Sequence, residues 1–269
     1  MLELLNFIFF QNAIISSILI SIACGCIGSL IMINRLFSMA GGITHGAFGG
    51  IGIAFYFSLP VLLSTSLFTV ILAFLVAYLS KHYPHRSDSI IAVIWAFGMA
   101  MGIILIDLSP GYSSDLMAYL FGSILAVSYH DIWIMAGIDC IFIVVLLCFY
   151  RQFEIISFDS EFAQTRGVNV NLFYYILILM ISLCIVISIR LVGLILVIAL
   201  LSIPSFIAEG LSKKLGWMMF YSSVLSFCFC LVGLISSYYF NLSSGACIII
   251  SACVAFVLYL CFRVFAKKS

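Results

Sequence analysis

Apolar runs of about 20 residues recur along the whole chain, separated by short polar or turn-forming stretches. About 20 residues in a helix cross a hydrocarbon core of about 30 Å, whereas membrane barrels show alternation over strands of about ten residues. The pattern therefore predicts an all-α, polytopic membrane bundle of eight or nine transmembrane helices. Nine spans are expected, at 11–33, 38–58, 61–80, 88–107, 131–150, 171–189, 191–208, 216–238 and 245–263.

The apolar stretch 116–127 has only twelve residues and is too short to cross alone, so it is expected to be a short re-entrant or interfacial segment. Without a long linker or a soluble insert, 1–269 is expected to form one transmembrane domain, with a loop at about 151–170. Residues Met1 to Glu3 lack the basic start of a signal peptide, and no small-residue cleavage site is found. No cleaved leader is therefore expected.

The positive charges predict the orientation, because cytoplasmic loops are enriched in Lys and Arg. With the N-terminus outside and nine crossings, ten of the eleven Lys and Arg residues face the cytoplasm, and Arg190 alone lies outside. The loop 151–170 then lies on the cytoplasmic side. The expected location is the bacterial inner membrane.

Composition supports a membrane protein, since 65% of the 269 residues are hydrophobic and 8% are charged, against about 25% charged in soluble domains. The net charge of +1 is spread between spans and forms no basic face for nucleic acid. The ten cysteines lie mostly inside apolar runs and form no CxxC pair, so they are interpreted as small apolar packing residues.

The second span holds a histidine within a glycine-rich stretch, 39–52. Gly42, Gly46 and Gly50 recur every four residues, so they share one helix face and allow another helix to approach closely. His45 lies about two turns into this apolar helix, where a polar ring needs a cavity, a partner or an ion. Two interpretations remain open: a hydrogen bond to a neighbouring helix, or a contact with a transported metal, which imidazole suits.

A short helix is predicted in the loop at 159–166. Asp159 is a favourable N-cap, Glu161 suits the first turn, and Arg166 and Gly167 suit the end of a helix. Phe158 and Phe162 are four residues apart and would form an exposed aromatic patch for a partner protein. The alternative is that these rings enter the lipid headgroups.

Pro204 interrupts the run 190–205 near its predicted cytoplasmic end. Proline removes a helical hydrogen bond, so a kink, a helix end or a hinge is expected there. Prolines also occur in membrane helices that do not switch.

Several stretches in this order and spacing resemble the permease family of zinc, manganese and iron ATP-binding-cassette (ABC) importers. The similarity covers roughly residues 10–262. It rests on the glycine-rich helix around His45, Leu120-Phe-Gly-Ser-Ile-Leu, Ser157-Phe-Asp-Ser-Glu-Phe-Ala, Val192-Gly-Leu-Ile-Leu-Val-Ile-Ala-Leu-Leu-Ser-Ile-Pro, and Gly233-Leu-Ile-Ser-Ser-Tyr-Tyr followed by Ser244-Gly-Ala.

The resemblance implies a divalent-metal permease that forms a homodimer, with separate ATPase subunits beneath it and an external metal-binding protein above it. Zinc is preferred as the cargo, with manganese and iron as alternatives. The helix at 159–166 would be the coupling helix, and His45 would match the metal-pathway histidine. ATP would bind to the partner subunit, because the sequence contains no GxxxxGK[ST] loop. The chain is therefore expected to be a translocation subunit without enzymatic activity, holding no cofactor of its own.

The sequence departs from the family at Gly41, where members often carry an Asp four residues before the histidine. Asp and His at that spacing would face the same ion, so the glycine argues against a two-ligand site on this helix and for a more transient contact. Asp107, Asp115, Asp131 and His130 would lie outside, either as solvated loop charges or as groups that gather cations.

Other classes of protein remain as alternatives. A vitamin or metal-chelate ABC permease would share this architecture. An ATPase-independent secondary transporter would need acidic groups deep in several spans, whereas chiefly Asp139 is found there. An intramembrane enzyme would need a catalytic group such as HExxH or paired aspartates, and the sequence contains neither.

Overall fold

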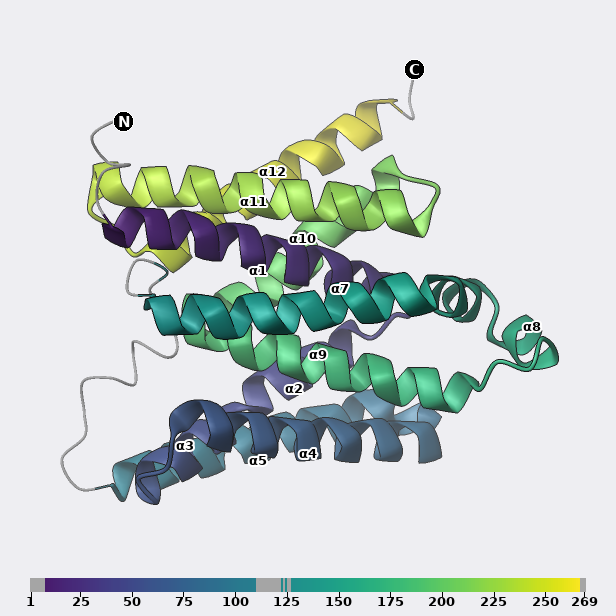
Figure 1. The fold of residues 1–269 in the computed structure, drawn as a ribbon, viewed down its shortest axis with the longest axis horizontal. Coiled ribbons are helices and arrows are strands. Elements are labelled where there is room, and N and C mark those ends of the chain that lie inside the picture. The colour runs from purple at the N-terminus through teal and green to yellow at the C-terminus, as the bar shows by residue number, and fades with distance from the viewer. Residues whose placement is uncertain (1–7, 110–121, 123, 125–126, 267–269) are drawn as a thin grey trace. The chain divides into compact units, whose positions relative to one another are not determined.

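The computed structural model describes residues 8–109, 122, 124 and 127–266, and its regular structure there is helical (Figure 1). Eight of the described helices are long and apolar enough to cross a membrane. This confirms the predicted all-α, polytopic bundle. In chain order the elements are α1 (Ile8–Ile33), α2 (Phe37–Gly46), α3 (Phe48–Tyr56), α4 (Val61–His82), η2 (Pro84–Arg86), α5 (Ser87–Asp107), α7 (Tyr129–Phe158), α8 (Ser160–Thr165), α9 (Val170–Val192), α10 (Leu194–Leu211), α11 (Leu215–Phe240) and α12 (Ser244–Ala266).

The second predicted span, 38–58, differs from the expectation of one continuous helix. It is divided into α2 and α3 at Ala47, whose dihedral angles (φ −56°, ψ −22°) nevertheless remain helical. The Ala47 N–H donates to the Ile43 carbonyl at 2.9 Å, but the Gly50 N–H bonds back to Ala47 at 3.0 Å, which is a tighter turn. Glycines are weak helix formers, and three follow within five residues of the break. The stretch is therefore helical on both sides of Ala47 but locally irregular just after His45, and neither α2 nor α3 is among the eight helices long enough to cross a membrane.

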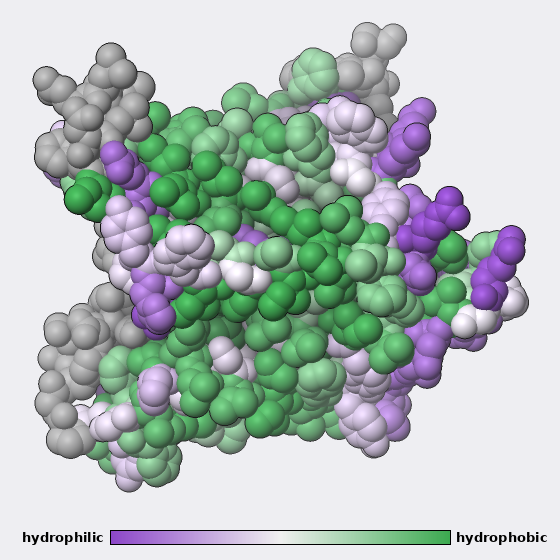
Figure 2. All heavy atoms as spheres, viewed as in Figure 1, coloured by the Kyte–Doolittle hydropathy of each residue, from purple (hydrophilic) through white to green (hydrophobic). Residues whose placement is uncertain are grey.

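The sides of the helices carry the apolar surface expected of a protein in lipid. Leu63, Leu67 and Ile71 follow one another at four-residue spacing along α4 and are 60–68% exposed, whereas Thr65 and Thr69 on its other face are buried. Soluble monomers rarely expose such contiguous apolar faces. Figure 2 shows hydrophobic residues covering the helix sides, with hydrophilic residues mainly at the helix ends, those near α8 included.

The described residues divide into two compact units that interleave along the sequence. The first contains the described residues within 1–32, 120–141 and 191–269, and the second contains those within 33–119 and 142–190. In the second unit, α5 packs against α2, α3 and α4 (Figure 1). This helix group holds His45.

In the first unit, α10, α11 and α12 pack against one another. Pro204 lies inside α10, which continues to Leu211, so the proline does not end this helix. The hydroxyl groups of Ser205 on α10 and Ser222 on α11 lie 2.9 Å apart and share a hydrogen bond. Most of the predicted re-entrant segment 116–127 lies outside the described residues.

Candidate functional site

The His45 ring lies against a tryptophan. His45 is the second-last residue of α2, and its imidazole stacks on the indole of Trp95 on α5, with ring centroids 4.4 Å apart and planes 12° apart. Its Nδ1 is buried and has no hydrogen-bond partner in the described part of the chain. In the described part of the chain this ring meets the neighbouring helix α5 through an aromatic contact.

The three glycines predicted to allow close packing all face neighbouring helices. A Cβ atom added at Gly46 would lie 2.7 Å from Leu72 Cδ2 of α4, and one at Gly50 would lie 2.9 Å from the Thr65 Cα. At Gly42 an added Cβ would collide with the Ile91 side chain of α5. These glycines hold the α2–α3 segment against both α4 and α5.

Sequence reasoning missed the partner glycines on α5. A Cβ at Gly98 would lie 2.7 Å from the Gly46 Cα, and one at Gly102 would lie 2.6 Å from the Phe48 carbonyl oxygen. Gly98 and Gly102 form a GxxxG spacing, a known signal for close helix packing in membranes. Trp95 precedes Gly98 by three residues and so lies on the same helix face. That spacing is the sequence signal that could have marked α5 as a helix that packs closely against another, although it does not say which one.

Gly41 lies one turn before His45 and is surrounded differently from the packed glycines. A Cβ added at Gly41 would meet no atom within 4 Å. The absence of the family carboxylate is therefore not a steric requirement of this fold, because a side chain has room to project from this position.

The short helix predicted in the loop is α8, Ser160–Thr165. The Asp159 carboxylate accepts a hydrogen bond from the Phe162 N–H at 2.9 Å, as an N-cap does. At the other end Gly167 has a φ of +78°, and the N–H of Val168 bonds to the Ala163 carbonyl at 3.0 Å. Both ends of this helix are thus closed by local hydrogen bonds in the way that its sequence indicates.

The end of α7 and the helix α8 each carry an exposed aromatic ring. Phe158 is 64% exposed and Phe162 is 46% exposed, while Ala163 is fully buried and anchors the helix to the protein. The Arg166 guanidinium lies over the Phe162 ring, with its central carbon 5.2 Å from the ring centroid. This cation–π contact restrains the ring at the surface, and Glu161 lies exposed in the first turn beside it.

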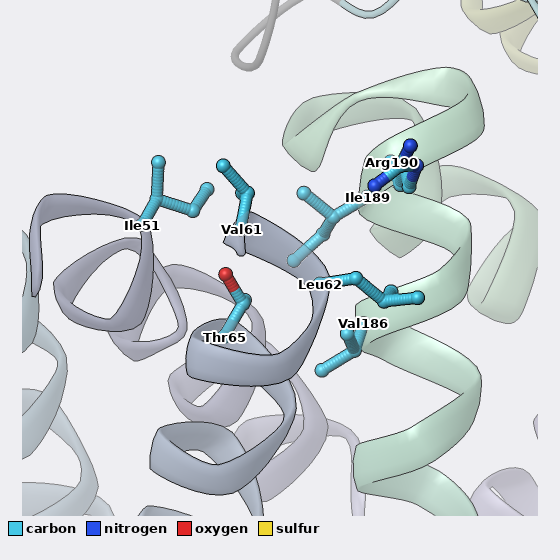
Figure 3. Close-up of a pocket in the computed structure, with 7 residues that line it drawn as sticks. All are labelled: Ile51, Val61, Leu62, Thr65, Val186, Ile189 and Arg190. Carbon is cyan, nitrogen blue, oxygen red and sulfur yellow. The ribbon is translucent and has the colours of Figure 1, made fainter. Parts of the chain in front are cut away.

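The residues around His45 do not form a closed metal cage. The described residues contain no group of three or more His, Cys, Asp or Glu side chains able to hold a metal ion. A small hollow between α3, α4 and α9 is lined mainly by aliphatic groups, with Thr65 and Arg190 as its polar members (Figure 3). A guanidinium repels cations, so this hollow is not a metal site.

The other charged candidates that the structure describes lie in or beside α5 and α7. Asp107 ends α5 and is exposed, and Asp131 accepts a hydrogen bond from the Ser128 hydroxyl at 2.7 Å near the start of α7. His130 is exposed beside it, whereas Asp115 lies outside the described residues. Asp139 is 3% exposed within α7, and its Oδ2 has no hydrogen-bond partner in the described part of the chain.

Comparison with known proteins gives near full-length matches. A sequence model of the ABC 3 transport family matches residues 6–263. An uncharacterized membrane protein of Synechocystis sp. is 47% identical over 263 residues, covering 98% of this chain and 94% of that protein. The manganese transport system membrane protein MntC of Halalkalibacterium halodurans is 31% identical over 95% of this chain and 88% of its own length.

A solved structure has the same fold. A chain of PsaBC from Streptococcus pneumoniae, solved in complex with Fab, aligns with a TM-score of 0.86 at 31% identity. The alignment covers 96% of this chain and 92% of that chain.

Proposed function

Because the chain belongs to the ABC 3 transport family, we propose that it is the membrane-spanning permease subunit of an ABC importer whose cargo is manganese. The observation that carries this proposal is the near full-length similarity to proteins named for manganese transport, at 31–32% identity. Those names move the preferred cargo from zinc, which the sequence favoured, to manganese. Zinc and iron remain the alternatives for the test.

The whole chain, 1–269, acts in this proposal as one permease domain in the bacterial inner membrane. Two copies form the translocation unit, an ATPase subunit lies beneath each copy, and an external metal-binding protein delivers the ion. ATP is bound and hydrolysed by the partner subunits, and this chain converts their movement into passage of the metal.

His45 is the metal-contacting residue of the pathway in this proposal. Its half-buried imidazole has a nitrogen without a hydrogen-bond partner, and neutral imidazole binds first-row divalent metals. A single weak ligand per chain suits transport, because a site with many ligands would retain the ion instead of releasing it. The packed glycines Gly42, Gly46 and Gly50 keep the backbone of this helix in place.

The coupling contact is α8 together with the predicted loop 151–170, of which residues 151–158 form the end of α7 in the structure. Phe158 and Phe162 are the exposed rings that insert into the ATPase, and Asp159 and Gly167 hold the helix in shape. The caps matter because a helix of six residues is not stable alone. Pro204 in α10 is proposed as the hinge that accommodates the resulting movement.

The test is uptake of radioactive manganese, zinc and iron into proteoliposomes that contain this chain with its ATPase and the binding protein. We expect ATP-dependent uptake, with manganese preferred, and strong loss of uptake in His45→Ala. His85→Ala is the matched control, because His85 lies exposed in the short helix η2. Equal uptake by His45→Ala and wild type would remove His45 from the pathway. Metal uptake by the purified chain without ATP would indicate a secondary transporter instead.

A further inference from the structure

The His45 imidazole and the Trp95 indole are nearly parallel, and this geometry is suited to metal binding. The centroid distance of 4.4 Å and the angle of 12° place the indole over one face of the imidazole. The lone pairs that bind metals lie in the plane of the imidazole ring, pointing away from its edge. Stacking therefore covers a face that a metal does not need, and the indole does not cover the ring edge that carries the two nitrogens.

The indole is itself held in place on its own helix. The Trp95 Nε1–H donates to the sulfur of Met99 at 3.0 Å, one turn further along α5. Tryptophan N–H groups away from water seek such a partner, and a thioether is a soft acceptor. With this bond and the stacked imidazole, the orientation of Trp95 is defined on two sides.

The two helices that carry these rings are also held at a defined separation. Gly98 lies against the backbone of Gly46, the residue after His45. Because Trp95 and Gly98 share a face of α5, the glycine contact fixes the distance from which the indole reaches the imidazole. Without these contacts the imidazole ring would rotate about χ2, because histidine χ2 angles have a broad distribution.

We propose that Trp95 is a positioning residue for the metal step at His45, and that Met99 orients Trp95. The indole holds the imidazole plane so that its coordinating edge faces the path of the ion. Trp95 contributes no metal ligand itself. This inference rests on the proposed role of His45, and nothing in the family match or in the names of the relatives assigns a role to Trp95 or Met99.

The first experiment uses Trp95 as its own reporter. Trp95, Trp133 and Trp217 are the three tryptophans of the chain, so Trp133→Phe with Trp217→Phe leaves a single indole at the site. Both replaced residues are exposed, at 76% and 54%. In the purified full-length chain in detergent, we expect added cobalt(II), a quenching stand-in for manganese, to quench the Trp95 emission, because a metal on the stacked imidazole lies within a few ångströms of the indole.

Two further variants in this single-tryptophan background test whether the quenching comes from a metal bound at His45. We expect His45→Ala to abolish it, and Met99→Leu to weaken the apparent cobalt affinity by about tenfold, the size of effect that residues orienting a metal ligand show. A role of Met99 in packing alone would leave the cobalt titration unchanged. Quenching that persists in His45→Ala would place the metal elsewhere and overturn the proposal.

The second experiment measures uptake with Trp95 replaced. We expect Trp95→Leu to reduce ATP-dependent metal uptake about tenfold at equal protein level and equal thermal stability. Trp95→Phe should stay within about twofold of wild type, since a phenyl ring still stacks on imidazole. If His45→Ala transports normally, the proposed pathway itself fails. If His45→Ala is inactive while Trp95→Leu transports like wild type, the pathway stands and the positioning role is wrong.

Discussion

The contact between Gly98 and Gly46 makes the sharpest prediction about the His45 helix group. In Gly98→Ala the new Cβ would lie 2.7 Å from the Gly46 Cα, 2.8 Å from its carbonyl oxygen and 3.1 Å from its carbonyl carbon. All three are backbone atoms, so no side-chain rotation relieves the overlap. Carbon atoms pack best at about 3.5–4.0 Å, and α5 must therefore move away from α2 by about 1 Å at this point.

The magnitude follows from two opposing terms. Overpacking by a methyl group typically costs about 1–3 kcal/mol. Alanine is also a better helix former than glycine by about 0.5–1 kcal/mol, which partly offsets the cost. Gly137→Ala in α7 is the matched control, because its Cβ meets no atom within 4 Å and gains the same helix preference. Relative to this control, Gly98→Ala should lose about 1–3 kcal/mol of stability.

The assay is thermal unfolding of both variants in detergent, followed by loss of the monodisperse peak in gel filtration after heating. In soluble domains of this size, 1 kcal/mol corresponds to about 2–4 °C, so Gly98→Ala should unfold several degrees below Gly137→Ala. Uptake should fall as well, because Trp95 moves with α5. Equal unfolding temperatures for the two variants would refute the inferred helix contact.

Three further predictions concern the other proposed parts. Gly41→Asp should fold normally, because the added Cβ has free space. It should bind manganese more tightly in equilibrium dialysis, since the new carboxylate lies one turn from His45. Unchanged binding would show that this helix face does not meet the ion. Phe162→Asp should abolish stimulation of the partner ATPase. Asp159→Ala should weaken this stimulation, because it removes an N-cap worth about 1 kcal/mol. Wild-type stimulation in both variants would count against the coupling role. Pro204→Ala should stabilise α10 in the same heating assay yet slow uptake, whereas unchanged uptake would exclude a hinge there.

The GxxxG spacing on α5 shows what a sequence pattern can and cannot predict about helix packing. Gly42, Gly46 and Gly50 were recognised as a packing face, but Gly98 and Gly102, which meet that helix segment, were overlooked although they follow the same rule. A single sequence provides the spacing on each helix without stating which two helices pair. Trp95 was missed for the same reason, since a lone tryptophan in an apolar run looks like any other lipid-facing ring.

The sequence by itself determined the membrane class, the positions of eight of the nine predicted spans and the capped helix α8. These features depend on hydrophobic length and on hydrogen bonds between residues a few positions apart, such as that from the Phe162 N–H to Asp159. Only the tertiary structure decided the break at Ala47 and the stacking of His45 on Trp95. The physical reason is that lipid solvates every apolar helix face about equally well, so hydropathy carries little information about helix pairing, which close packing decides.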